Sequence, residues 1–440
     1  MIVARQSGAL NFLILFTFLT TFIFSIGQRY LQWGIDAASI FRFEIIGCFA
    51  IGTMLFSFRR GNPITPYFLY SFFILLLGFS FIPLNQYNEN LNSYDFILLA
   101  LTVFFFLGGI YCGEKVHLNI IPIPIPVRYR LMFFWGVAVL SILIFLLECV
   151  KLGFIPLTKM LSMNVYHAMN DNAIPVLHYF TQAAYIVPIW ACLLCKKKYL
   201  SKKKRNVIIA LELFVVFNSL SRQMWLLLLI GLGLYYMYYY VVSKRRLLLF
   251  VAIAVGMFMV IGAIRLSTII SDNRSNTEYL QAYAGTQYET NLIETYIALY
   301  STNNFTTFKN YVQESDKQGY RGYGVYTLRP IYTMTLLNRM SCFDINPTYD
   351  AFSALGTYAI DPYLDFGIYG VVFLNFLYGF IVAFAYKKYE RKNYRWIVPW
   401  VVLAFCVLMA AFANFFNTFF VWLILMLNFL VLPPCINDAK

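Results

Sequence analysis

Residues 387–413 read KKYERKNYRWIVPWVVLAFCVLMAAFA, and this stretch decides the fold class. Its first nine residues carry five Lys or Arg side chains, whereas residues 396–413 carry no charge. An apolar run of roughly 17–25 residues is long enough to cross a bilayer as an α-helix. Positive charge beside such a run favours the cytoplasmic side of the membrane. The stretch therefore predicts a membrane-spanning helix that follows a cytoplasmic loop.

Similar apolar runs recur along the whole chain. A water-soluble protein with 60% hydrophobic and only 12% charged residues could not cover its core, whereas helices that face lipid also need apolar surfaces. The run after Arg5 has spanning length and no small-residue cleavage site, so we interpret it as a span rather than a signal peptide. We predict an all-α polytopic membrane protein with about twelve transmembrane helices, at residues 9–27, 37–58, 67–83, 94–112, 131–149, 174–195, 207–221, 223–242, 247–264, 367–386, 396–413 and 417–433.

The positive charge is distributed unevenly between the predicted loops. Every second loop is basic, and these loops with the two chain ends hold 22 of the 34 Lys and Arg residues beside only three acidic residues. This is the positive-inside asymmetry of membrane proteins. The net charge of +14 therefore indicates orientation, with both termini in the cytoplasm, and no nucleic acid is expected as a partner.

The predicted spans divide the chain into three parts. Residues 1–264 hold the first nine transmembrane helices, and residues 366–440 hold the last three. Between them, residues 265–365 form a large extracytoplasmic loop with amphipathic helices.

Apolar residues at near-helical spacing within the large loop predict a helix on the bilayer surface. These residues are Leu280, Tyr283, Leu292, Tyr296 and Leu299. Gly319, Gly322 and Gly324 then predict a turn. Pro330 opens a further predicted helix that runs to about Met340.

Arginine is the residue type that is most informative about function. Eight arginines lie outside the predicted cytoplasmic loops, namely Arg29, Arg42, Arg222, Arg265, Arg274, Arg321, Arg329 and Arg339. Arg222 lies in a very tight external turn between two spans, and Arg265 ends the ninth span. Any one of them could reach lipid phosphate by snorkelling. Several at one membrane surface favour a diphosphate ligand, because a guanidinium group donates bidentate hydrogen bonds to phosphate oxygens.

Two aspartates stand out among the carboxylates of the large loop. Asp361 and Asp365 lie in residues 356–370, GTYAIDPYLDFGIYG, where the loop returns to the membrane. Partial desolvation at such a position raises the pKa of a carboxyl group toward that of a useful general base. The alternative for Asp365 is a role as the N-cap of the tenth span.

No metal site is predicted. The three histidines lack the spacing of a ligand pair, and no carboxylate motif accompanies them. Cys192 and Cys195 have the spacing of half a metal or redox site, but no second pair is near, so we interpret them as packing residues. Glu212, within the seventh span, is expected to be buried and hydrogen-bonded. His167, in a short external loop, is a further candidate for acid–base work.

The whole layout resembles the Wzy-type polymerases of oligosaccharide repeat units, the O-antigen polymerase family. The matching features are the Ser221-Arg222 turn, Arg265 at the end of the next span, the large external loop, and the stretch from Tyr358 to Asp365-Phe-Gly367-x-x-Gly370. The resemblance covers the full length by topology and only short stretches by residue.

The resemblance implies a GT-C-like glycosyltransferase of the bacterial inner membrane that needs no metal and no cofactor. Its substrates would be undecaprenyl-diphosphate-linked oligosaccharides, with the growing glycan of one transferred to the sugar of another. Membrane lipids and a chain-length regulator protein would be its other partners.

The resemblance also implies roles for single residues. The leaving diphosphate would be held by Arg222 and Arg265, together with Arg274, Arg329 and Arg339. Asp365 or Asp361 would be the base, with Tyr358 positioning the substrate. Related O-antigen ligases carry a histidine shortly before the matching aspartate, where this chain has Thr357 and Tyr358, and this departure favours a polymerase. Tyr320, Tyr323 and Tyr326 would stack on sugar rings or pack at the lipid interface.

Three alternatives stay open. A lipid-linked oligosaccharide flippase also needs about twelve spans, but it should show two related halves and polar residues along its central helices. A GT-C enzyme with a monophosphate lipid donor usually carries paired acids in its first external loop, where this chain has only Asp36. A purely structural membrane component is the third alternative.

Overall fold

The fold is built from helices. The computed structural model describes residues 16–17, 19–21, 37–58, 64–82, 91–116, 124–160, 165–219, 221–240, 249, 256, 295, 298–335, 337 and 356–434, and none of these residues forms a strand. The α-helices are α2 (Ala37–Phe58), α3 (Pro66–Phe79), α4 (Ser93–Lys115), α5 (Val127–Leu152), α6 (Val165–Asn172), α7 (His178–Ala183), α8 (Val187–Lys196), α9 (Lys202–Ser219), α10 (Arg222–Tyr239), α14 (Asn303–Gln318), α15 (Arg329–Met334), α16 (Ile360–Glu390), α17 (Ile397–Leu408) and α18 (Phe419–Val431).

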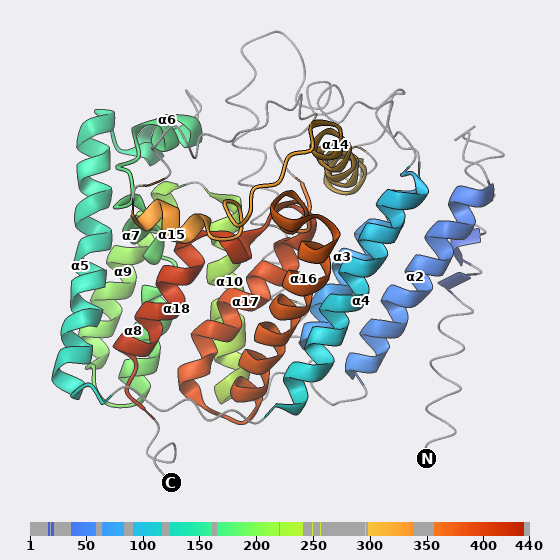
Figure 1. Cartoon of the computed structure of the whole chain (residues 1–440). Coiled ribbons are helices and arrows are strands. Elements are labelled where there is room, and N and C mark those ends of the chain that lie inside the picture. The colour runs from blue at the N-terminus through green and yellow to red at the C-terminus, as the bar shows by residue number, and fades with distance from the viewer. Residues whose placement is uncertain are drawn as a thin grey trace, which may run out of the picture.

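Most of the long helices run roughly alongside one another in a single bundle (Figure 1). Within the described residues, five helical segments are long and apolar enough to cross a membrane, namely Ala37–Ser57, Ser93–Lys115, Val127–Lys159, Ile360–Glu390 and Tyr394–Ala411. Shorter apolar helices are Pro66–Phe79, Val187–Lys196 and Phe419–Val431. The described part is therefore an all-helical bundle with the apolar helices of a membrane protein.

The helices differ from the predicted spans in two informative places. The span predicted at 174–195 is two helices, α7 and α8, separated by a turn at residues 184–186. Pro188 explains the break, because its ring clashes with a helical carbonyl four residues earlier and it has no N–H to donate. Helix α16 begins at Ile360, seven residues before the predicted 367. The spans predicted at 9–27 and 247–264 lie almost entirely outside the described residues.

The closest helix pair of the bundle is α4 with α16. Gly109 of α4 packs against the carbonyl of Phe376, and Gly379 of α16 packs against the carbonyl of Phe106. A Cβ atom added to either glycine would lie 2.0 or 2.1 Å from the facing oxygen. Small residues allow helix backbones to approach closely where lipid supplies no hydrophobic drive for association. This contact anchors α16, which carries both candidate aspartates.

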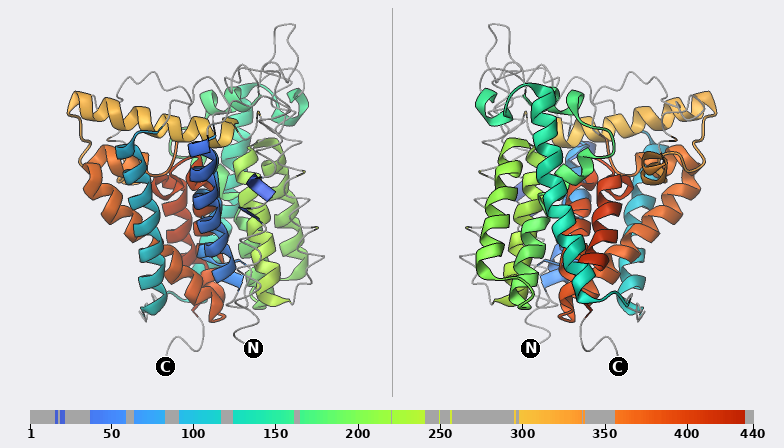
Figure 2. Two further views of the ribbon diagram at one scale, coloured as in Figure 1. Left: turned by 90° about the vertical axis from the view of Figure 1, so that its right-hand side faces the viewer. Right: turned by 90° about the vertical axis from the view of Figure 1, so that its left-hand side faces the viewer.

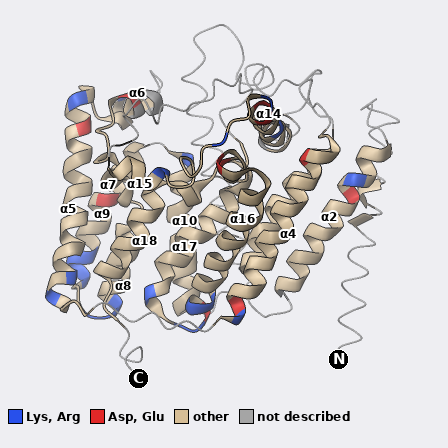
Figure 3. Cartoon of the chain, viewed as in Figure 1, with Lys and Arg blue, Asp and Glu red and all other residues tan. Residues whose placement is uncertain are grey.

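The two ends of the bundle differ in charge. Lys and Arg side chains gather at one end (Figure 3). That end holds the last residues of α4, α8 and α16 and the first residues of α5 and α9, where the sequence has Lys115, Lys196, Lys387, Arg128 and Lys202. Helix α14 lies across the opposite end of the bundle (Figure 2). It ends at Gly319, whose φ of 61° confirms the turn that the glycines predict.

One arginine of the basic end has a structural role. Arg130 is fully buried and donates hydrogen bonds to the carbonyls of Phe429 and Leu432, at 2.7 and 2.9 Å. Arg395 donates to the Phe429 carbonyl as well, at 3.3 Å. These carbonyls belong to the C-terminal turn of α18, where they have no helical partner. Arg130 lies at the basic end of the bundle, and its hydrogen bonds cap the C-terminus of α18.

Candidate functional site

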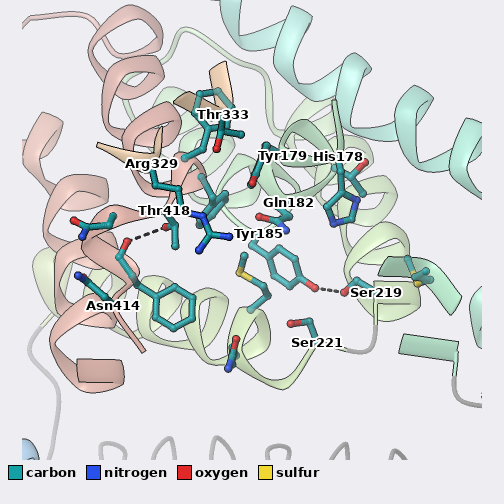
Figure 4. A pocket seen from close by; sticks show the side chains of 18 of the residues that line it. His178, Tyr179, Gln182, Tyr185, Ser219, Ser221, Arg329, Thr333, Asn414 and Thr418 are labelled. Carbon is teal, nitrogen blue, oxygen red and sulfur yellow. Dashed lines mark hydrogen bonds between the residues drawn. The ribbon is translucent and has the colours of Figure 1, made fainter. Parts of the chain in front are cut away.

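A cavity of about 310 Å³ opens at the end of the bundle where α16 begins, opposite the basic end. Its walls come from α7, the turn between α9 and α10, helix α15, the first turn of α16 and the link between α17 and α18. Figure 4 shows the Arg329 guanidinium reaching in from one side and the His178 ring at the other. Segments nearly 250 residues apart in the sequence therefore form one site.

Asp361 and Asp365 lie one helical turn apart at the start of α16. Four-residue spacing puts two side chains on the same face of a regular helix. Helix α16 is kinked just after both aspartates, at Gly367, which has φ 60° and ψ −142°. The kink brings Gly370 against the carbonyl of Pro362, 2.0 Å from an added Cβ. The positive φ at Gly367 and the close contact at Gly370 explain why both positions of the Asp-Phe-Gly-x-x-Gly stretch are glycine.

Asp361 is the aspartate that lines the cavity. Its Oδ2 accepts a hydrogen bond of 3.3 Å from the Asn417 side-chain amide. The Asn417 carbonyl oxygen in turn accepts a hydrogen bond of 2.7 Å from the Tyr378 hydroxyl. The Asp361 carboxylate is thus held at the cavity by the Asn417 amide, and Asn414 and Arg329 also act on it.

Arg329 lines the same cavity from the first residue of α15. Pro330 follows at the start of the helix, where a missing N–H costs nothing, and Thr333 faces the cavity one turn later. The positive charge of Arg329 is close enough to act on Asp361. A solvent-exposed guanidinium and a carboxylate of the predicted set therefore meet at one opening.

Arg222 stands at the edge of the site. It is the first residue of α10, and its neighbours Ser221 and Gln223 line the cavity while Arg222 does not. The tight turn predicted between the two spans is confirmed, since α9 ends at Ser219 and α10 begins at Arg222.

Asp365 points away from the cavity and is fully buried. Its Oδ1 accepts a hydrogen bond from the Tyr326 amide at 3.1 Å, and its Oδ2 accepts from the Thr327 amide at 2.6 Å and the Thr327 hydroxyl at 2.5 Å. Gly322 lies so close that an added Cβ would be 2.6 Å from Oδ1. Both carboxylate oxygens are therefore engaged by the turn at residues 319–328, which fits a structural anchor rather than a base.

Arg321 fastens the other side of the same turn. It forms an ion pair of 2.8 Å with Asp316 and lies over the ring of Tyr363, 5.1 Å from the centroid. The Tyr363 hydroxyl donates to the Asp316 carboxylate at 2.7 Å. Partial burial lowers the pKa of Arg321, but the hydrogen bond and charge of Asp316 and Tyr363 outweigh burial and leave that pKa raised. This arginine stays charged and engaged within the protein.

Tyr358 is fully buried outside the cavity lining. Its hydroxyl lies 2.9 Å from the Tyr70 hydroxyl, and its ring packs edge-on against Phe73 and Phe106. Its amide donates to the Ala410 carbonyl at 2.8 Å. Tyr358 thus ties the start of α16 to α3, to α4 and to the turn after α17, a role unlike the predicted substrate positioning.

The other predicted residues lie outside the described part of the chain or away from the cavity. Arg265, Arg274 and Arg339 lie outside the described residues. Glu212 is fully buried and accepts a hydrogen bond from the Ser141 hydroxyl at 2.8 Å, as predicted. Among the described residues, no group of three or more His, Cys, Asp or Glu side chains could hold a metal ion.

Sequence reasoning missed several residues of the cavity. The link between α17 and α18 contributes Asn414, Asn417 and Thr418 to the cavity lining. The sequence signal for these residues is a short polar run between two very apolar helices. His178 also lines the cavity, paired with Glu148 of α5. Glu148 is an acid at the end of an apolar span, a position that is a functional candidate by default.

Comparisons of the chain with known protein families, with curated protein sequences and with solved structures find no match.

Proposed function

We propose that the protein is a polytopic glycosyltransferase of a bacterial inner membrane that polymerises undecaprenyl-diphosphate-linked oligosaccharide repeat units. In this proposal the described helices belong to a GT-C-like bundle of about twelve spans with both termini in the cytoplasm. The observation that carries the proposal is one cavity that combines Arg329, Asp361 and neutral hydrogen-bonding side chains.

The position of the cavity supports a substrate that is attached to lipid on the outer face. The basic helix ends would face the cytoplasm by the positive-inside rule. The start of α16 would then lie at the extracytoplasmic surface, where α14 runs across the bundle (Figure 2). A lipid diphosphate anchored in the outer leaflet would reach this opening with its glycan directed outward.

The residues of the cavity suit transfer of a sugar from diphosphate. Arg329 would hold the diphosphate and stabilise the charge that develops on it as the glycosidic bond breaks, with Arg222 next to the opening. Asn414, Asn417 and Gln182 offer amides that can donate to and accept from sugar hydroxyls. Of the two aspartates predicted as the base, Asp361 lines the cavity and Asp365 does not.

The test is reconstitution of the purified protein in liposomes. The substrate is a preparation of undecaprenyl-diphosphate-linked repeat units extracted from cells that lack this protein, in which single units should accumulate. We expect polymers of several repeat units, and we expect them to form equally in the presence of a metal chelator. Gel electrophoresis of the released glycans gives the measurement.

Two other outcomes would count against the proposal. Unaltered units that cross from one leaflet to the other, measured with a membrane-impermeant glycosidase, would identify a flippase. Polymer that disappears with the chelator and returns with a divalent cation would refute metal-independent transfer.

A further inference from the structure

A histidine and a glutamate form a pair at the wall of the cavity. His178 Nδ1 lies 2.9 Å from Oε1 and 3.2 Å from Oε2 of Glu148. The Glu148 side chain is 6% exposed and does not line the cavity, whereas His178 is 19% exposed and does. The His178 imidazole therefore lies between the cavity and the Glu148 carboxylate.

Glu148 is fixed in this position by further hydrogen bonds. The Ile174 amide donates to Oε1 at 3.1 Å, and the Thr181 hydroxyl donates to Oε2 at 3.4 Å. A carboxylate on Nδ1 favours the tautomer in which Nδ1 carries the proton. The opposite nitrogen, Nε2, is then a proton acceptor, and among the described residues it has no hydrogen-bond partner.

The two sides of the cavity differ in what they offer. Arg329 reaches in from one side and acts electrostatically on Asp361, so these two groups belong to the side of the leaving diphosphate. His178 lies toward the other side (Figure 4). When a sugar is displaced in line, the base acts on the face of the ring opposite the leaving group. His178 therefore lies on the side from which such a base would act.

We propose that His178 is the general base of the transfer and that Glu148 positions it. This inference rests on the proposed function. The acceptor hydroxyl oxygen forms a bond to the anomeric carbon of the donor, and its proton moves to Nε2 of His178. The bond from that carbon to the diphosphate oxygen breaks, and its electron pair leaves with the diphosphate held by Arg329.

His178→Asn removes the proposed base and keeps the hydrogen bond to Glu148. The Asn amide nitrogen can take the place of Nδ1 and still donate to Glu148, while the base at Nε2 is lost. With the extracted lipid-linked repeat units in liposomes, we expect kcat to fall by about 10²–10⁴-fold, the usual contribution of a general base. KM should change much less, because the donor diphosphate is held elsewhere in the cavity.

Glu148→Gln tests the positioning role, with Glu212→Gln as its matched control. Both glutamates are buried and accept a hydrogen bond from a hydroxyl group. The hydroxyl partner of Glu212 is Ser141, and neither of these two residues lines the cavity. We expect Glu148→Gln to lower kcat by a smaller factor than His178→Asn, and Glu212→Gln to leave kcat unchanged. Added imidazole should raise the rate of His178→Ala, which a merely structural role would not produce.

The outcomes for the dyad and for the function are distinct. A wild-type protein that leaves the repeat units unjoined overturns the proposed function, and the base proposal with it. A wild-type protein that polymerises while His178→Asn keeps the wild-type kcat overturns the base proposal alone. If His178→Asn does not fold, Glu148→Gln decides, since equal kcat values for Glu148→Gln and Glu212→Gln refute the dyad.

Discussion

Two polar regions lie at the start of α16, and each combines an arginine with aspartate side chains. In the turn at residues 319–328, Arg321 is paired with Asp316 and both oxygens of Asp365 accept hydrogen bonds from the turn. In the cavity, Arg329 is exposed to the opening and Asp361 accepts one long hydrogen bond from Asn417. The residue types are the same, but Arg329 and Asp361 line a cavity that a ligand could enter, whereas Arg321 and Asp365 are bonded within the protein.

The comparison shows why charge at a membrane surface is a poor guide to a site on its own. A buried charge is retained only when its hydrogen bonds are satisfied, and the turn satisfies them within the protein. The cavity leaves hydrogen-bonding capacity that a substrate would complete. We therefore expect substitutions in the cavity to affect function and substitutions in the turn at residues 319–328 to affect stability.

Among the changes that compare these two regions, the largest effect is expected from removing the cavity arginine. Arg329→Ala should lower the rate of polymer formation by roughly 10²–10³-fold, because it removes a donor that stabilises the developing charge on the leaving group. The rate is measured in liposomes with the extracted lipid-linked units. Arg321→Ala is the matched control and should keep the wild-type rate at low temperature while lowering the melting temperature. Equal losses of rate in both variants would remove the distinction between the two regions.

A smaller effect is expected from the buried aspartate of the turn. Asp365→Asn replaces an acceptor oxygen with an amide that faces backbone N–H donors, so it should lower the free energy of unfolding by about 1–3 kcal/mol. Thermal unfolding in detergent gives the measurement, and the folded fraction should keep its turnover. Asp361→Asn should lose less stability, since the hydrogen bond from Asn417 to Asp361 is long, at 3.3 Å, and comes from a side chain. A variant Asp365→Asn with unchanged melting temperature and no turnover would restore Asp365 as a base.

The smallest effect is expected from the tyrosine pair beneath α16. Tyr358→Phe removes the hydrogen bond to Tyr70 and should cost about 0.5–1.5 kcal/mol of stability without changing turnover. Tyr70→Phe removes the same bond from the other partner and should have the same effect. Loss of turnover in Tyr358→Phe alone, at normal stability, would show that the hydroxyl acts on substrate as the resemblance implies.

Local structure was predictable where a local cause sets it. The turn at Arg222, the start of the helix at Pro330 and the glycine turn at Gly319 follow from residues whose backbone preferences act over a few positions. The end of that helix was predicted near Met340, but α15 ends at Met334. The break between α7 and α8 carries an equally local signal in Pro188, which the length of the apolar run obscured. The early start of α16 was not predictable from hydropathy, because its first turns are held by packing and by the turn at 319–328.

The amino-acid sequence alone predicted a helical chain with about twelve spans, because apolar run length is a property of neighbouring residues. Among the described residues, five helical segments are long and apolar enough to cross a membrane. Only the tertiary structure decided which charges meet. Asp361 and Asp365 are four residues apart, yet contacts from distant elements place one at the cavity and bond the other to the turn at residues 319–328. His178 joins Arg329 for the same reason, since side-chain partners depend on how helices pack in three dimensions.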